Sequence, residues 1–165
     1  MNLSEILLPE LAFDAPPVTS QGQLFDLIAS RLLEAKIAQD SYSLIAGFCK
    51  REKLCSTAVG HGVAIPHSCT SAVDRIIIVI IRLKTAVDWR ARDNQPVNLV
   101  VALISPPSLY SVYLQVLATL ARVLRLESVR RLVLDAPSPA EAAKIIARVA
   151  GMQEQGTEGF IEPVC

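Results

Sequence analysis

Histidine and the aromatic residues are scarce in this chain. It holds two histidines among 165 residues, and Phe, Trp and Tyr together make up 5%. An excess of charge of either sign is also missing, because sixteen basic residues balance sixteen acidic ones. Such a balance gives no overall field that would attract nucleic acid or an anionic membrane surface. We therefore expect no nucleic-acid partner, and any partner must be recognised by a local site.

Long hydrophobic runs are absent as well. The most apolar stretch, Ile76 to Leu83, is far shorter than the roughly 20 residues that cross a bilayer, and Arg82 interrupts it. The first residues lack a basic region followed by a continuous apolar stretch, so we expect no secretory signal peptide. These absences predict a soluble, cytoplasmic protein without membrane insertion. Since 52% of the residues are hydrophobic, the chain can build one substantial core.

The cysteines lack both the spacing and the density of a disulfide scaffold, and we expect reduced thiols. One alternative stays open, because four residues of the types that zinc prefers form the pattern C-x5-H-x5-H-x-C. These four are Cys55, His61, His67 and Cys69. Their spacing matches no usual zinc finger or ribbon. A non-catalytic metal-binding or interaction domain is therefore the second candidate, and the leading interpretation requires no metal and no cofactor.

Familiar catalytic motifs are missing too. The chain has no Walker A sequence and no G-x-G-x-x-G after a predicted strand, so nothing supports nucleotide binding. Neither a G-x-S-x-G elbow nor an H-E-x-x-H pair is present. No recognisable hydrolase is encoded.

Helical periodicity is found on both sides of the chain's middle. Ser20 and Asp40 are suitable N-caps, and apolar residues at helical spacing follow each of them, which predicts two helices. From Tyr110 a further apolar stripe predicts a helix of about four turns. Two shorter helices are expected over residues 128–136 and 138–150.

Two β-branched runs in the middle of the chain predict strands. Residues 75–83 and 96–104 are apolar without alternation, which is typical of strands covered on both faces. Helices before and after such strands indicate an α/β domain with a mixed β-sheet flanked by helices on both faces. From Gly151 the helical periodicity is lost. We therefore expect a single domain over residues 1–150 and a flexible tail over 151–165.

Both histidines lie in one segment, GHGVAIPH. Gly60 and Gly62 permit a turn around His61, whereas Pro66 fixes its own φ directly before His67. Stiff backbone presents a reactive nitrogen reproducibly, and apolar neighbours disfavour the imidazolium. His67 is thus the better candidate nucleophile and His61 a supporting residue that shapes the loop. A capping or core role for His67 stays open.

The segment REKLCSTAVGHGVAIPHS, Arg51 to Ser68, resembles the signature of enzyme IIA domains of the bacterial phosphoenolpyruvate-dependent phosphotransferase system. The class is the fructose/mannitol class (type 2), which includes the nitrogen-regulatory proteins. The resemblance extends through YLQVLATLARVL and APSPAEAAKII and covers about Leu3 to Val149. It implies a helix-flanked mixed sheet and a transient phosphohistidine, with no bound metal or nucleotide.

The resemblance also implies roles for single residues. In this family the histidine of IPH accepts a phosphoryl group from HPr or an HPr-like carrier, which makes His67 the acceptor. Arg51 matches the family's arginine and would stabilise the phosphoryl oxygens. His61 matches a position that carries Asn or His, which favours a role in the loop. Where the family usually places a second active-site histidine, this chain has Tyr113.

Two roles follow for such a phosphocarrier. It can regulate a target protein through the phosphorylation state of His67, or it can pass the phosphoryl group to a IIB domain during sugar transport. The lack of a fused membrane or IIB segment and of the second histidine favours the regulatory role. Because Tyr113 replaces an imidazole, weak activity, or a degenerate member that binds partners without being phosphorylated, also stays open.

Overall fold

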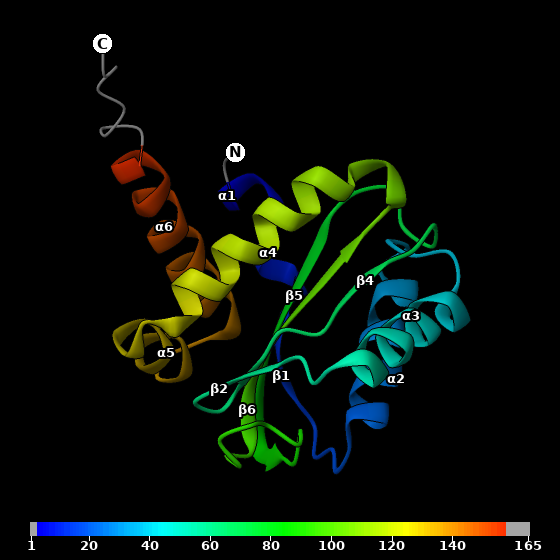
Figure 1. Ribbon diagram of the computed structural model, residues 1–165, viewed down its shortest axis with the longest axis horizontal. Helices are drawn as coiled ribbons and strands as arrows, with labels where there is room; N and C mark the ends of the chain where they lie inside the picture. The colour runs from blue at the N-terminus through cyan, green and yellow to red at the C-terminus, as the bar shows by residue number, and fades with distance from the viewer. Residues whose placement is uncertain (1–2, 158–165) are drawn as a thin grey trace.

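The computed structural model describes residues 3–157. In chain order its elements are α1 (Leu3–Ile6), η1 (Pro9–Leu11), β1 (Ala12–Ala15), α2 (Gln21–Glu34), α3 (Ser41–Leu54), β2 (Ala58–Gly60), β3 (Val63–Ala64), β4 (His67–Cys69), β5 (Ile77–Val87), β6 (Val97–Ser105), η2 (Pro107–Leu109), α4 (Tyr110–Arg125), α5 (Glu127–Leu134) and α6 (Pro139–Thr157). Helices α2 and α3 cover one face of the sheet, and α4, α5 and α6 cover the other (Figure 1). The predicted mixed sheet between two helical layers is confirmed.

The sheet is mixed because its two long central strands, β5 and β6, run antiparallel while β1, β3 and β4 join them in parallel, and β2 pairs antiparallel with β3. The strand order is β1-β5-β6-β3-β2, with β4 also paired to β6. β1 runs parallel to β5, and β3 and β4 run parallel to β6. Alternate residues of β5 enter the two cores, Ile77 and Val79 on one side and Ile78 and Ile80 on the other. Burial on both faces explains why this run does not alternate between apolar and polar residues.

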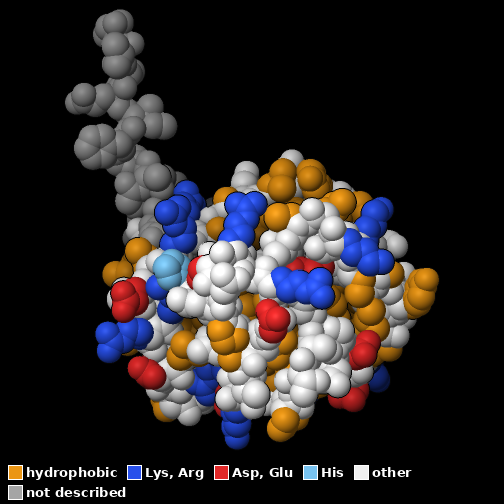
Figure 2. Space-filling model, turned by 60° about the horizontal axis from the view of Figure 1, so that its bottom comes forward, with side chains coloured by type: hydrophobic (Ala, Val, Ile, Leu, Met, Phe, Trp, Pro, Cys, Tyr) orange, Lys and Arg blue, Asp and Glu red, His pale blue; other side chains and the backbone are white. Residues whose placement is uncertain are grey.

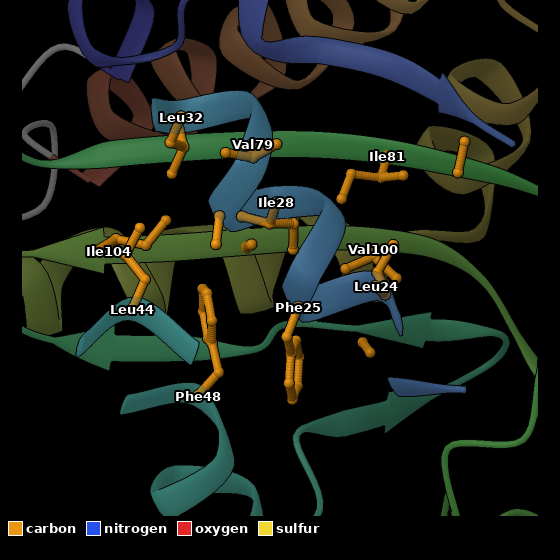
Figure 3. Packing of buried hydrophobic residues seen from close by; sticks show 14 of the residues in the cluster. Leu24, Phe25, Ile28, Leu32, Leu44, Phe48, Val79, Ile81, Val100 and Ile104 are labelled. Atoms are coloured by element: carbon orange, nitrogen blue, oxygen red, sulfur yellow. The ribbon is translucent and has the colours of Figure 1, made fainter. Parts of the chain in front are cut away.

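Aromatic contacts hold α2 against α3 and against the loop after β5. The rings of Phe25 and Phe48 stack with centroids 5.0 Å apart, and Trp89 meets Phe25 edge-on at 6.0 Å. Figure 3 shows these two phenylalanines between the helices and the strands, among the apolar residues of this core. The labelled members are Leu24, Phe25, Ile28, Leu32, Leu44, Phe48, Val79, Ile81, Val100 and Ile104. This packing determines where the carboxyl end of α3 lies.

The predicted caps of α2 and α3 are both present. The Ser20 side chain accepts a hydrogen bond from the backbone N–H of Gln23, and Asp40 accepts from the N–H groups of Tyr42 and Ser43. Each acceptor satisfies backbone donors that a helix start leaves free. The two helices therefore begin where the sequence indicates.

Three parts of the fold differ from the expectation. β5 runs on to Val87, beyond the predicted end at residue 83. The strands β1 to β4 were not predicted, because runs of two to four residues show no measurable period. The expected tail from Gly151 is wrong for residues 151–157, since α6 continues to Thr157. A glycine inside a helix costs only about 1 kcal/mol, which the rest of a long helix can offset. The remainder of the predicted tail, residues 158–165, lies outside the described residues.

None of the individual helices within residues 3–157 combines the length and the apolar composition of a membrane span. The segments Pro107–Arg125 and Glu127–Leu134 meet that test only when taken together, across an 88° bend. On the face drawn in Figure 2, acidic and basic side chains are interspersed instead of gathered by sign. That face agrees with the balanced composition.

Candidate functional site

A cavity of about 490 Å³ opens between the carboxyl end of α3, β4 and the first turns of α4. Its lining includes Arg51, His67 and Tyr113. These three residues were singled out by the sequence for chemistry, and the fold brings them together from three separate elements. His61 is not among the lining residues.

The hydrogen bonds of His67 distinguish its two ring nitrogens. Nδ1 lies 2.7 Å from the backbone carbonyl oxygen of Ile65, and Nε2 lies 2.9 Å from Nε of Arg51, which donates to it. A carbonyl only accepts and a guanidinium only donates, so these partners assign the proton to Nδ1 and the lone pair to Nε2. The nucleophilic nitrogen of this buried ring is therefore Nε2, and it faces the guanidinium.

Arg51 reaches His67 from the last turn of α3. While its Nε donates to the imidazole, its Nη1 donates to the carbonyl oxygen of Cys55 at 2.9 Å. The second bond anchors the guanidinium to the end of its own helix. Other N–H groups of the planar fork stay available for the oxygens of an anion.

Tyr113 lies in the first turn of α4, with its ring centroid 6.1 Å from that of His67. It also stacks on Tyr110 at 5.7 Å. Burial raises the pKa of Tyr113 to about 12, so its hydroxyl keeps the proton at neutral pH. Where the family resemblance predicts a second histidine, the structure thus has a neutral donor at the cavity.

The turn of GHGVAIPH lies apart from this cavity. Gly60 and Gly62 have φ values of 89° and 76°, and His61 between them has 56°. The backbone N–H of His61 donates to Oδ2 of Asp93 at 2.7 Å, which holds the turn between β2 and β3. This contact lowers the pKa of the Asp93 carboxyl, because a hydrogen-bonded carboxylate is favoured over the acid. It is made by the backbone of His61 and does not use the imidazole.

Pro66 joins this turn to the strand that carries His67. Its carbonyl oxygen accepts a hydrogen bond from the N–H of Leu103 on β6, at 2.9 Å. The next residues pair with the same strand, His67 opposite Leu103 and Ser68 opposite Ile104. His67 is thus anchored to the central sheet at the first residue of β4.

The alternative zinc site finds no support in the described part of the chain. Within residues 3–157 no group of three or more His, Cys, Asp or Glu lies close enough to hold a metal ion. Cys55 and Cys69 line different cavities, and His61 lines neither. The described cysteines, including Cys49, are free thiols. Cys165 lies outside the described residues.

Sequence reasoning missed the backbone carbonyl that orients the imidazole and two residues that lie behind it. Ile65 acts through its carbonyl, which no side-chain pattern can reveal. Glu52 and Thr57 lie behind the site and bond to each other. Both lie in the segment that carries the family resemblance, in which a glutamate follows the arginine, but the sequence assigned neither of them a role.

Burial is the main cause that lowers the pKa of His67, and the positive charge of Arg51 adds to it. The hydrogen bond to Ile65 opposes both, because it favours the protonated ring. Burial prevails, and the imidazole stays neutral near neutral pH with its Nε2 lone pair available.

We expect an NMR pH titration to place the pKa of His67 below its ordinary value of 6.5. In the unfolded chain this imidazole takes up its proton near 6.5. Between that pH and the lower folded pKa, the unfolded state binds more protons, so this group makes the protein less stable as the pH falls. A measured pKa at or above 6.5 would contradict the assignment of a buried, neutral ring.

Comparison with known proteins finds relatives that cover most of this chain. Residues 5–149 match the family described as "Phosphoenolpyruvate-dependent sugar phosphotransferase system, EIIA 2". The chain is 34% identical to a nitrogen regulatory protein of Bradyrhizobium diazoefficiens over 125 residues, 76% of this chain and 81% of the relative. It is 28% identical to a PTS system fructose-specific EIIA component of Haloferax volcanii over 139 residues, 84% and 90% of the two chains.

A solved structure is similar over nearly the same extent. The nitrogen regulatory protein IIA-Ntr from Neisseria meningitidis superposes with a TM-score of 0.79 at 31% identity, covering 87% of this chain and 98% of that one. The family resemblance of the signature segment is thereby confirmed. The chain belongs to the EIIA type 2 family of the phosphoenolpyruvate-dependent sugar phosphotransferase system.

Proposed function

We propose that this protein is a phosphocarrier whose His67 accepts a phosphoryl group on Nε2 from the phosphohistidine of an HPr-like protein. One observation carries the proposal: the imidazole is held with its proton on Nδ1 and its lone pair toward the guanidinium of Arg51, inside a cavity. A nucleophile and a group that stabilises oxyanions are therefore already side by side.

The transfer needs no further reagent. As the donor's P–N bond breaks, its electron pair returns to the donor imidazole, and the lone pair of His67 Nε2 forms the new P–N bond. In the resting protein Nε–H of Arg51 donates a hydrogen bond to this lone pair. During the transfer the same N–H donates to a phosphoryl oxygen instead. The carbonyl of Ile65 stabilises the positive charge that develops on the ring. Because the donor arrives phosphorylated, neither a nucleotide nor a metal is required.

The test uses phosphoenolpyruvate, enzyme I and an HPr-like carrier. We expect the wild-type protein to gain about one equivalent of acid-labile phosphate, and His67→Ala to gain none, because the attacking nitrogen is gone. His61→Asn is the matched control, since Asn tolerates the positive φ of this turn, and it should keep the phosphate. A wild-type protein that gains no phosphate overturns the proposal.

Tyr113 is proposed to donate a hydrogen bond from its hydroxyl to a phosphoryl oxygen. Replacing it by His offers a charged donor at the same place, and we expect Tyr113→His to raise the rate of transfer on the order of tenfold, the effect of strengthening one hydrogen bond with charge. Tyr113→Phe removes only the hydroxyl and should lower the rate. Rates measured by quenched flow that stay equal in all three proteins would show that the site does not use this residue.

Within this proposal, the regulatory role has more support than sugar transport. One nitrogen regulatory relative at 34% identity and one solved nitrogen regulatory structure at 31% exceed two fructose-specific relatives at 28% and 30%, while further nitrogen regulatory relatives are 28–30% identical. Exposed Leu54 and Leu114 border the cavity, so a phosphoryl dianion beside them would change which partner can dock. When a fructose-type IIB domain is added to the phosphorylated protein, we expect the phosphate to stay on His67. Rapid loss to IIB would assign the protein to sugar transport.

A further inference from the structure

A cluster of three hydrogen-bonded side chains lies behind the site, and the transfer step does not touch it. Glu52 accepts from the backbone N–H of Thr57 at 3.0 Å through Oε1, and from the Thr57 hydroxyl through Oε2. The same hydroxyl oxygen accepts from Nε1–H of Trp89 at 3.2 Å. Thr57 and Trp89 are buried, and Glu52 is half-buried. The cluster is therefore held firmly in place.

Thr57 connects this cluster to the imidazole. Its carbonyl oxygen accepts from the backbone N–H of Ile65 at 3.0 Å. The carbonyl oxygen of Ile65 in turn accepts a hydrogen bond from Nδ1–H of His67 at 2.7 Å. Consecutive hydrogen bonds thus lead from the Glu52 carboxylate to the ring nitrogen that must carry the proton.

The second partner of His67 is held by the same short segment. Arg51 directly precedes Glu52, and its Nη1 donates to the carbonyl oxygen of Cys55, two residues before Thr57. The turn that follows α3 therefore positions the donor on Nε2 as well as the acceptor on Nδ1. Glu52 closes this turn by bonding both the backbone and the side chain of Thr57.

We propose that Glu52 is the positioning residue of the phosphoryl-transfer site, which through Thr57 and Ile65 keeps the proton of His67 on Nδ1 and the lone pair on Nε2. Its importance for transfer rests on the proposed function. The orientation of the ring, however, can be observed in the protein without phosphate.

A carboxylate suits this position because it only accepts hydrogen bonds. The oxygen of the Thr57 hydroxyl already accepts a hydrogen bond from Trp89. The O–H of Thr57 must therefore donate its own hydrogen bond to a group that only accepts. An amide in place of Glu52 would present N–H groups to the same oxygen and leave one donor unpaired in a buried place. Glu52→Gln is therefore nearly isosteric and yet incompatible with the network.

The experiment compares the ¹⁵N shifts of the His67 imidazole in unphosphorylated protein, at a pH where the ring is neutral. We expect the Nδ1–H tautomer in the wild type and in Glu34→Gln, an exposed carboxylate on α2. In Glu52→Gln and in Thr57→Val, which lacks the hydroxyl, the Nε2–H tautomer should become populated and the rate of phosphorylation should fall on the order of tenfold. Thr57→Ser restores the hydroxyl and should restore the wild-type shifts.

Each outcome bears on one claim. If folded Glu52→Gln keeps the Nδ1–H tautomer, Glu52 does not position the ring, even if transfer slows. If that variant does not fold, the comparison of Thr57→Val with Thr57→Ser decides the question, because the two differ by one hydroxyl in the same connection. If the tautomers shift as expected but the wild type takes up no phosphate, the positioning stands and the proposed function fails.

Discussion

We expect Arg51→Lys to lower the rate of the proposed phosphorylation of His67 about 100-fold, the usual effect of removing one oriented donor from a developing oxyanion. Arg51 donates at the same time to Nε2 of His67 and to the carbonyl oxygen of Cys55, so its fork is fixed before the phosphoryl group arrives. A lysine ammonium keeps the charge, but as a point charge on a flexible stem it cannot reproduce both directions.

The measurement is the single-turnover rate with a phosphorylated HPr-like donor. Arg125→Lys is the matched control, because Arg125 is exposed at the end of α4, away from the cavity. Arg51→Met separates charge from geometry: burial is the main cause that lowers the pKa of His67, but the charge of Arg51 contributes, so this variant should bring that pKa closer to 6.5. A rate for Arg51→Lys within threefold of the wild type would show that charge alone suffices.

The parts of the fold that the sequence predicted are those fixed by local chemistry. Ser20 and Asp40 cap helices with their own side chains, and the apolar run of β5 has a length and composition that need no partner to be recognised. β3, in contrast, consists of two residues and exists because Val63 and Ala64 pair with β6. No local pattern contains that information, since the pairing joins segments that are distant in the sequence.

The same division applies to the site. The two histidines of GHGVAIPH were expected to have different roles, because glycines favour a turn at His61 and Pro66 stiffens the backbone before His67. In the structure His67 lines the cavity and His61 does not. The family resemblance supplied Arg51 and Tyr113, and the fold places both at the cavity with His67. The choice of ring nitrogen could not be predicted, because it depends on a backbone carbonyl and on a guanidinium from another element.

Gly47→Ala is expected to destabilise the protein by about 3 kcal/mol, the upper part of the usual range for an overpacked core. Gly47 lies within α3 at the point where this helix crosses β4. A Cβ built there would lie 2.1 Å from Oγ and 3.2 Å from Cβ of Ser68. Helix propensity alone would make the alanine variant more stable by about 1 kcal/mol. A loss of stability would therefore indicate close packing at Gly47, and a gain would indicate that propensity dominates.

Urea unfolding measures this cost, and Gly22→Ala is the matched control. A Cβ at Gly22, in α2, would have its nearest neighbour at 3.9 Å, an ordinary contact, so that variant should be as stable as the wild type or slightly more stable. Because α3 carries Arg51 and β4 carries His67, we also expect Gly47→Ala to slow phosphorylation by separating the guanidinium from Nε2. Gly22→Ala should not.

Substitution of Ser68, the residue that a Cβ at Gly47 would meet, also tests whether close packing is the cause. Its Oγ is buried and has no hydrogen-bond partner within residues 3–157, so Ser68→Ala alone removes an unsatisfied hydroxyl and should raise stability by about 1 kcal/mol. In the Gly47→Ala background the same change also removes the 2.1 Å contact and leaves the one at 3.2 Å. It should therefore recover about 2 kcal/mol or more there, which is non-additive as expected for residues in contact. If the two substitutions add independently, the glycine is required for some reason other than the close approach of α3 to the strand that carries His67.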